Sequence, residues 1–134
     1  MNLQSTAMKL LLDTHAFLWL ISNQRLSQRA VDAFLDPGNQ PYLSAASYWE
    51  ICIKRSVGKL DLAEGWEQSF DQEMIANDIR WLPIEKAHCQ AVIELPWFHR
   101  DPFDRLLIAQ ARCEGLSIVT TDAHFPQYGV ETIW

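Results

Sequence analysis

Short apolar runs alternate with stretches of helical spacing along the whole chain. The run at 9–13 is apolar on both faces, which is typical of a fully buried strand, and further short strands are expected at 41–44, 79–84, 116–122 and 130–134. Apolar residues three or four positions apart predict helices over 14–21, 28–36, 45–58, 65–78, 85–95 and 102–115, whereas 124–129 predicts a loop. Strands that alternate with helices favour a parallel sheet covered on both faces. We therefore expect one α/β domain.

The predicted helix over 45–58 has an amphipathic pattern. Its apolar positions Ala46, Trp49, Ile53 and Val57 recur at intervals of three or four residues. Gly58 then ends the helix, as glycine commonly does.

The composition is that of a globular protein. The 134 residues are 49% hydrophobic and 21% charged, which fits one folded domain and neither a disordered chain nor a coiled coil. The apolar stretch 9–21 is interrupted by Asp13 and His15 and is too short to cross a membrane, and the residues before it do not resemble a secretory signal. We expect a cytoplasmic protein without a membrane partner. Its three cysteines lack a CxxC spacing, which is typical of reduced, packed thiols.

The stretch "HRDPFDRLLIAQA" at 99–111 places two aspartates at the start of a helix. Asp101 has the pattern of an N-cap followed by Pro102 in the first helical position, so capping is the favoured interpretation for Asp101. Asp104 lies in the first turn, where an acid suits the helix dipole. The local pattern alone does not separate a structural from a chemical role for Asp104.

Asp104 is one of four acids that this topology brings to the same edge of the sheet. Asp13 and Asp122 directly follow apolar strands, and Glu50 lies early in the helix after the second strand. A helix that runs antiparallel to the strands begins at the edge where the strands end, so Asp104 belongs there too. Each acid taken singly is explained as a cap or a surface charge, but together they predict a site.

Such a cluster requires protons or cations. Two carboxylates about 5 Å apart repel each other by about 3 kcal/mol at an effective dielectric of about 20. Oxygen ligands suit Mg²⁺ or Mn²⁺, and these ions activate water for phosphodiester hydrolysis. The histidines form no HxxxH pair and do not indicate zinc; they are His15, His88, His99 and His124.

The net charge of −6 argues against a protein that holds nucleic acid through an overall positive field. A divalent ion would answer this objection locally, and basic side chains near the acids are available for the phosphate backbone. These candidates for RNA binding are Lys54, Arg55, Lys59, Arg100 and Arg105.

The remaining residues near the motif have open interpretations. Trp97 and Phe98 offer stacking platforms for unpaired bases, but packing in a core or dimer interface is the favoured interpretation. His99 and Arg100 suit either phosphate contact or plain solvation. His15 is interpreted as a packing or supporting residue, because one histidine beside a carboxylate is weak evidence for a general base.

Four segments together resemble the PIN domain, in the order found in bacterial VapC-type toxins of toxin–antitoxin modules. The segments are "LLLDTHAFLWL", "LSAASYWEICIKRSVGKL", "HRDPFDRLLIAQA" and "IVTTDAHF", and the resemblance spans residues 8–134. It implies a three-layer α/β/α sandwich with a five-stranded parallel sheet and a Mg²⁺- or Mn²⁺-dependent ribonuclease centre. Met8 aligns with the usual family start, so 1–7 is interpreted as an upstream extension or a remnant of cloning.

The resemblance also assigns site residues and partners. The family's catalytic and metal-binding acids fall on Asp13, Glu50, Asp104 and Asp122. Thr120 or Thr121 is a possible polar helper, and Asp101 is an extra acid assigned only a supporting place. VapC-like toxins are typically homodimers that a small antitoxin neutralises in a larger hetero-oligomer, and their substrates are structured RNAs such as tRNA.

Two alternatives remain open at this point. One is a DNA-directed nuclease of the wider PIN and flap-nuclease group. Another is a non-catalytic module that binds a metal or a partner and whose acids are only caps. A receiver-like signalling module is disfavoured, because "LLLDT" lacks its paired acid and "IVTTD" its late lysine.

Overall fold

The computed structural model describes residues 7–22 and 26–134, so the expectation for the upstream segment lies outside the described residues except at Ala7. The described residues form a five-stranded sheet in the order β3-β2-β1-β4-β5. Every strand pairing is parallel, as the alternation of strands and helices predicts. The strands are β1 (Lys9–Leu12), β2 (Gln40–Ser44), β3 (Arg80–Leu82), β4 (Ser117–Val119) and β5 (Thr132–Ile133).

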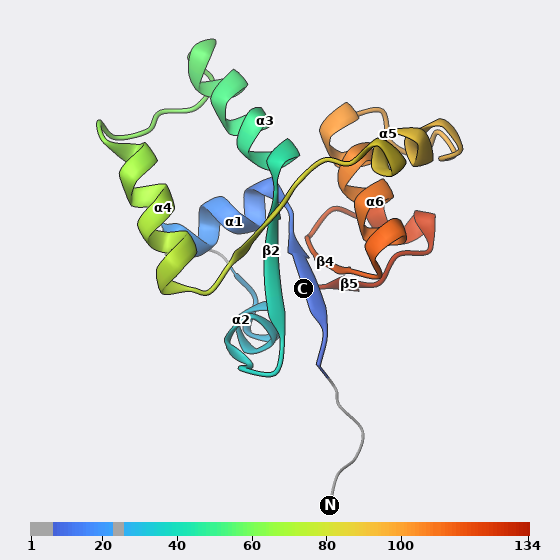
Figure 1. The fold of residues 1–134 in the computed structure, drawn as a ribbon, viewed down its shortest axis with the longest axis horizontal. Coiled ribbons are helices and arrows are strands. Elements are labelled where there is room, and N and C mark those ends of the chain that lie inside the picture. Colours follow the sequence, from blue (N-terminus) through green and yellow to red (C-terminus); the bar gives the residue numbers. More distant parts are fainter. Residues whose placement is uncertain (1–6, 23–25) are drawn as a thin grey trace, which may run out of the picture.

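Helices cover both faces of this sheet (Figure 1). One apolar core lies beneath α1 (Thr14–Ile21), α2 (Gln28–Leu35) and α4 (Trp66–Ala76), and the other beneath α5 (Lys86–Ile93) and α6 (Pro102–Glu114). The side chains of β1 alternate between them, since Leu10 and Leu12 join the first core and Leu11 the second. The predicted three-layer α/β/α architecture is confirmed.

The parallel register aligns the ends of the three central strands. Leu12 at the end of β1 pairs with Leu43 of β2 and with Val119 of β4. The next residue along each strand is polar and buried, and these residues are Asp13, Ser44 and Thr120. The carboxyl edge of the sheet therefore carries enclosed polar groups, which is where parallel α/β sheets bind their ligands.

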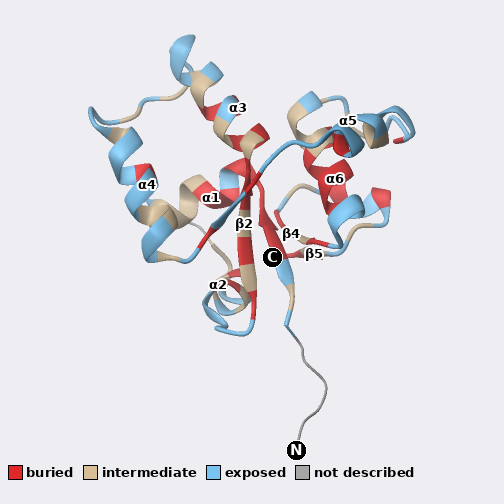
Figure 2. Ribbon diagram, viewed as in Figure 1, coloured by how far each residue is buried: buried red, intermediate tan, exposed pale blue. Residues whose placement is uncertain are grey.

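The apolar pattern of α3 (Ala45–Ser56) is only partly used for packing within the chain, since Ala46 alone of its four positions is buried. Trp49 is 58% exposed and Val57, just past the helix, is 60% exposed, with Ile53 exposed between them. Figure 2 shows exposed positions on the outer turns of α3. The buried side of α3 is offset from these three exposed positions and contains Ala46 and Ile51. The apolar periodicity thus identified an apolar row along α3, but it did not show that most of the row is left exposed by this chain.

The segment predicted as a loop after β4 contains a short 3₁₀ helix, η1 (Phe125–Tyr128). Pro126 suits its first turn, and Gly129 ends it with a left-handed φ of 75°. None of the helices in the described part of the chain is long and apolar enough to cross a membrane.

Candidate active site

Asp13 follows β1 and is almost fully buried. Its Oδ1 accepts a 2.6 Å hydrogen bond from the backbone N–H of Ala16, so it caps α1. The Thr120 side chain also hydrogen-bonds to this carboxylate. Burial nevertheless raises the pKa of Asp13, because these bonds and the charge of His15 only partly offset the loss of water, and Asp122 adds repulsion.

Glu50 lies on the buried side of α3, and both of its oxygens have partners. The Thr14 hydroxyl donates a 2.7 Å hydrogen bond to Oε1, and Lys54 Nζ lies 2.8 Å from Oε2. Lys54 therefore neutralises Glu50 in this structure, although the sequence offered it for RNA contact. The two partners fix the orientation of the carboxylate at the edge of the sheet.

Asp104 occupies the first turn of α6, and the predicted capping arrangement places it there. Asp101 Oδ1 accepts a 3.0 Å hydrogen bond from the Asp104 backbone N–H, and Pro102 opens the helix. Burial, and after it the negative charges of Asp101, Glu50, Asp13 and Asp122, together raise the pKa of Asp104 to about 8. The acids therefore share one electrostatic environment.

Two histidines that sequence spacing did not connect meet at this cluster. His99 Nε2 lies 2.9 Å from Asp104 Oδ2 and 3.1 Å from Asp122 Oδ2. His124 Nδ1 lies 2.8 Å from Asp122 Oδ1, and the two imidazole rings are 4.6 Å apart. A backbone N–H can only donate, so the 3.3 Å contact from the Asp101 N–H to His99 Nδ1 places the ring hydrogen of His99 on Nε2.

These contacts separate the titration of Asp122 from that of Asp104. Partial burial alone would raise the pKa of Asp122, but hydrogen bonds from the backbone and imidazole of His124, together with His99, hold it below its ordinary value. Asp122 is therefore ionised at neutral pH, whereas Asp104 retains a proton. Carboxyl groups driven apart in this way are typical of reactive sites.

Arg105 corrects one sequence-based expectation. Its guanidinium is buried and donates to the backbone carbonyls of Val92, Leu95, Pro96 and His99 at 2.8 to 3.3 Å. It also stacks on Trp97, 3.8 Å from the ring centroid. Arg105 has no fork free for phosphate, and its role is to hold the segment that carries His99. The other proposed RNA contacts, Arg55, Lys59 and Arg100, are exposed.

The sequence profile of the PIN domain family matches residues 10–131. The chain belongs to the PIN domain family. Ribonuclease VapC22 from Mycobacterium tuberculosis is 31% identical in an alignment of 117 residues, and the match covers 84% of this chain and 85% of that protein. The resemblance inferred from the four sequence motifs is therefore confirmed at the level of the family.

Solved structures with the same fold come from VapBC complexes. The complex of VapBC2 from Rickettsia felis with a promoter DNA fragment contains a chain with a TM-score of 0.72 and 17% identity, covering 93% of this chain and 97% of that one. DNA-bound VapBC from Salmonella typhimurium gives a TM-score of 0.68 and 17% identity, covering 93% and 96%. At these identities the likeness shows the PIN fold alone.

The polar helpers of this PIN domain are unequal. Thr120 is buried, hydrogen-bonds to Asp13 and accepts a 3.0 Å hydrogen bond from the Asp122 N–H. Thr121 is exposed, and no hydrogen bond described for it reaches the acids. Exposed His15 acts on Asp13 through charge and contacts Trp19, which fits a supporting role. Trp97 is 75% exposed, so only its face toward Arg105 is packed.

The donor set of the PIN site fits a hard divalent cation. The raised pKa of Asp104 has burial as its largest cause and the negative charge of neighbouring carboxyl groups as the next. A cation among these groups would relieve the repulsion and displace the proton. Carboxylate oxygens are the ligands that Mg²⁺ and Mn²⁺ prefer.

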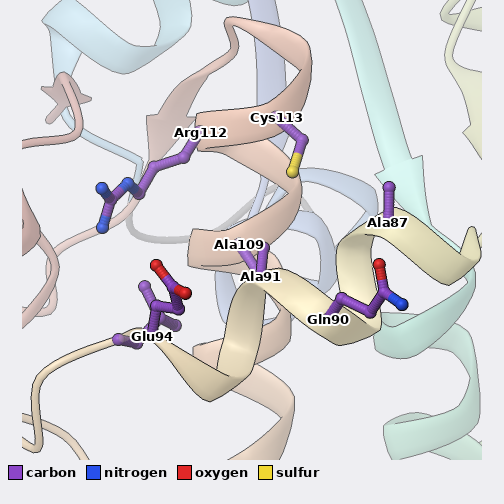
Figure 3. Close-up of a pocket in the computed structure, with 8 residues that line it drawn as sticks. Ala87, Gln90, Ala91, Glu94, Ala109, Arg112 and Cys113 are labelled. Atoms are coloured by element: carbon purple, nitrogen blue, oxygen red, sulfur yellow. The ribbon is translucent and has the colours of Figure 1, made fainter.

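A separate cavity of about 450 Å³ lies between α5 and α6 and is lined in part by Gln90, Glu94, Arg112 and Cys113 (Figure 3). Arg112 is about 12 Å along the helix axis from Asp104, at 1.5 Å per residue. This cavity therefore does not belong to the acid cluster. Cys113 and Cys89 are exposed free thiols, so the prediction of packed cysteines is wrong for both.

Proposed function

We propose that this chain is a metal-dependent endoribonuclease that hydrolyses phosphodiester bonds in RNA. The observation that carries the proposal is the group of acids at the carboxyl edge of a PIN-domain sheet, with the pKa of Asp104 raised to about 8. The relative named as a ribonuclease, VapC22, supports RNA as the substrate class. The cell compartment that contains such a substrate is the cytoplasm, where we place the chain.

Asp13, Glu50, Asp104 and Asp122 are the residues that would hold Mg²⁺ or Mn²⁺. When bound, the ion polarises the phosphoryl oxygen and lowers the pKa of the attacking water. The Thr120 hydroxyl links two of these acids, because it hydrogen-bonds to the Asp13 carboxylate and accepts the backbone N–H of Asp122. Asp104 must lose its proton to become an ionised ligand, which couples ion binding to pH.

The direct test is RNA cleavage by the purified chain with Mg²⁺ or Mn²⁺. EDTA should abolish cleavage, and Asp104→Asn should reduce it by about 10²-fold or more, because a neutral amide is a poor ligand. Asp61→Asn is the matched control, since Asp61 is an exposed acid between α3 and α4. Full activity of Asp104→Asn in Mg²⁺ would refute the site assignment.

The choice of RNA over DNA needs its own measurement. We expect a labelled structured RNA such as tRNA to be cleaved, and unlabelled RNA to compete better than single-stranded DNA of equal length. Equal competition by DNA would favour the broader PIN and flap-nuclease function. Absence of Mn²⁺ binding by calorimetry would instead favour a non-catalytic module.

We further propose that the nuclease is a toxin neutralised by an antitoxin that covers the α3 stripe, defined as Trp49, Ile53 and Val57. The stripe is exposed over its length and begins next to Glu50. Trp49 also packs on Phe103, the neighbour of Asp104, at a ring separation of 5.3 Å. A segment laid along the stripe would therefore reach the acids and block them.

A growth assay with the cognate antitoxin tests this surface. Cells that co-express both proteins should grow, and Ile53→Glu should restore growth arrest because it places a charge in the apolar contact. Leu35→Glu is the control, since Leu35 is 67% exposed on α2, shortly before β2 begins, at the opposite edge of the sheet. Continued neutralisation of Ile53→Glu would place the antitoxin elsewhere.

The free toxin is proposed to be a homodimer that enters a larger hetero-oligomer with the antitoxin. Apolar side chains outside the α3 stripe remain available for such contacts, including Ile75 and Ile93, each 82% exposed. Sedimentation equilibrium of the purified chain should give twice the monomer mass of 15.5 kDa. A single monomeric species at micromolar concentration would contradict this assembly.

A further inference from the structure

His99, Asp122 and His124 converge although they come from two different loops. One ligand atom from each lies within 4.8 Å of the other two. His99 is delivered by the segment before α6, and the other two residues follow β4. Sequence spacing did not indicate zinc because no two histidines form a local pair. This group is brought together by the fold instead.

The donor chemistry of this group differs from that of the acids. Two imidazole nitrogens and a carboxylate are ligands that Zn²⁺ and related transition metals take readily, whereas Mg²⁺ favours oxygen. Asp104 Oδ2, 2.9 Å from His99 Nε2, is close enough to complete a four-ligand set. We propose that His99, Asp122 and His124 form a second site, for a divalent transition-metal cation of the Zn²⁺ class, which shares Asp122 with the acidic cluster.

The surroundings hold His99 in place for this role. Its backbone N–H donates a 2.8 Å hydrogen bond to the Tyr128 hydroxyl, and its carbonyl accepts from Arg105 at 3.2 Å. Metal binding through Nε2 moves the ring hydrogen to Nδ1 and breaks the contact with the Asp101 N–H. That contact is 3.3 Å long, beyond the usual range for N–H donors, so little is lost.

The second ligand is reachable from solvent. The His124 side chain is 52% exposed, whereas the His99 side chain is 15% exposed. A cation can therefore enter from the side of His124 and meet the Asp122 carboxylate, whose Oδ1 lies 2.8 Å from His124 Nδ1. The same ion would withdraw Asp122 from the acidic cluster, so occupation of the second site inhibits the ribonuclease; this consequence rests on the proposed function.

The binding test uses Zn²⁺ and Co²⁺ with the purified full chain and does not depend on catalysis. Calorimetry measures Zn²⁺ affinity, and the visible absorption of Co²⁺ distinguishes a four-coordinate site with nitrogen ligands from a weakly absorbing six-coordinate oxygen site. We expect His99→Gln and His124→Gln each to weaken Zn²⁺ binding by about 10-fold or more and to remove the intense Co²⁺ bands. His15→Gln is the matched control, because His15 is exposed and lies outside the group.

The results separate this inference from the proposed function. Wild-type Zn²⁺ affinity in both His99→Gln and His124→Gln, or a Co²⁺ spectrum of the oxygen-only type, would overturn the site. Melting temperatures of each variant exclude loss of the fold as the cause of a lost signal. In the cleavage assay with Mg²⁺, added Zn²⁺ should inhibit the wild type, and the inhibited fraction should fall in His124→Gln. Equal inhibition in both would overturn the shared-ligand model, whereas a chain without cleavage in Mg²⁺ refutes only the ribonuclease.

Discussion

Asp104→Asn should stabilise the protein while it inactivates the site. The pKa of Asp104 is about 8 in the folded chain, against an ordinary value of 3.8, so the folded state keeps a proton that the unfolded chain releases. At pH 7 this costs up to about 4 kcal/mol, since each pH unit above the ordinary pKa corresponds to about 1.4 kcal/mol. Because the Asp104 side chain is 23% exposed, solvent screening reduces the expected gain to about 2 kcal/mol. Asparagine avoids the cost and still accepts from His99 through its amide oxygen.

The sign of the pH dependence is specific. Asp104 binds more protons in the folded than in the unfolded state between pH 3.8 and about 8, so its contribution to wild-type stability falls across that range and the advantage of Asp104→Asn grows with pH. Below the ordinary pKa both states are protonated, and the advantage disappears. The stabilisation from hydrogen bonds and packing changes little with pH. A substitution that stabilised the protein only by relaxing the helix would therefore show the same gain at every pH.

Urea unfolding in EDTA at pH 4, 7 and 9 measures this difference, with Asp61→Asn as the exposed control. We expect a gain of about 2 kcal/mol at pH 7, a larger gain at pH 9 and almost none at pH 4. Asp61→Asn should follow the wild type at every pH. An Asp104→Asn variant no more stable than the wild type at pH 9, or equally stabilised at pH 4, would refute the electrostatic explanation.

Three further outcomes test the surroundings of the acids. Mn²⁺ binding at pH 7 should release about one proton per ion, seen by calorimetry in buffers of different ionisation enthalpy, and fewer at pH 9, because Asp104 is protonated below about pH 8; no release at pH 7 contradicts this. Thr120→Val removes a hydrogen bond that lowers the pKa of Asp13, so the acid limb of the cleavage pH profile should move to higher pH, whereas exposed Thr121→Val should leave it in place. Arg105→Lys should lower the free energy of unfolding in urea by about 2 kcal/mol, since an ammonium group cannot donate to all of the carbonyls from Val92 to His99. A loss under about 0.5 kcal/mol would contradict the role of Arg105 in holding this segment.

Much of the fold was predictable because its signals are local. Asp101, Pro102 and Gly115 mark both ends of α6, and the structure places the helix between them. Apolar runs placed the strands, and strand–helix alternation implied that their ends share an edge. The positions of Asp13 and Asp122 at that edge follow from topology without knowledge of any side-chain contact.

What escaped prediction depends on contacts between distant segments. His99 and His124 are separated along the chain by the whole of α6, and only the return through β4 brings their rings together. Arg105 is a residue type that commonly contacts phosphate, but its guanidinium donates instead to the carbonyls of Leu95 and Pro96. Whether a charged side chain is buried is decided by such tertiary partners, and a single-sequence pattern does not contain them.

The two aspartates of "HRDPFDR" combine the roles that first looked like alternatives. Asp101 fixes the start of α6 by accepting the backbone N–H of Asp104, and this places the Asp104 carboxyl at the sheet edge. The negative charge of Asp101 is then the largest neighbouring charge that raises the pKa of Asp104. A cap that only stabilised the helix would not also place Asp104 beside the other acids of the site. The free-energy cost of placing Asp104 among these acids is offset by the rest of α6 and by the hydrogen bonds of Arg105. A divalent cation that binds the acids would relieve their repulsion, so this cost would contribute to the affinity for the cation.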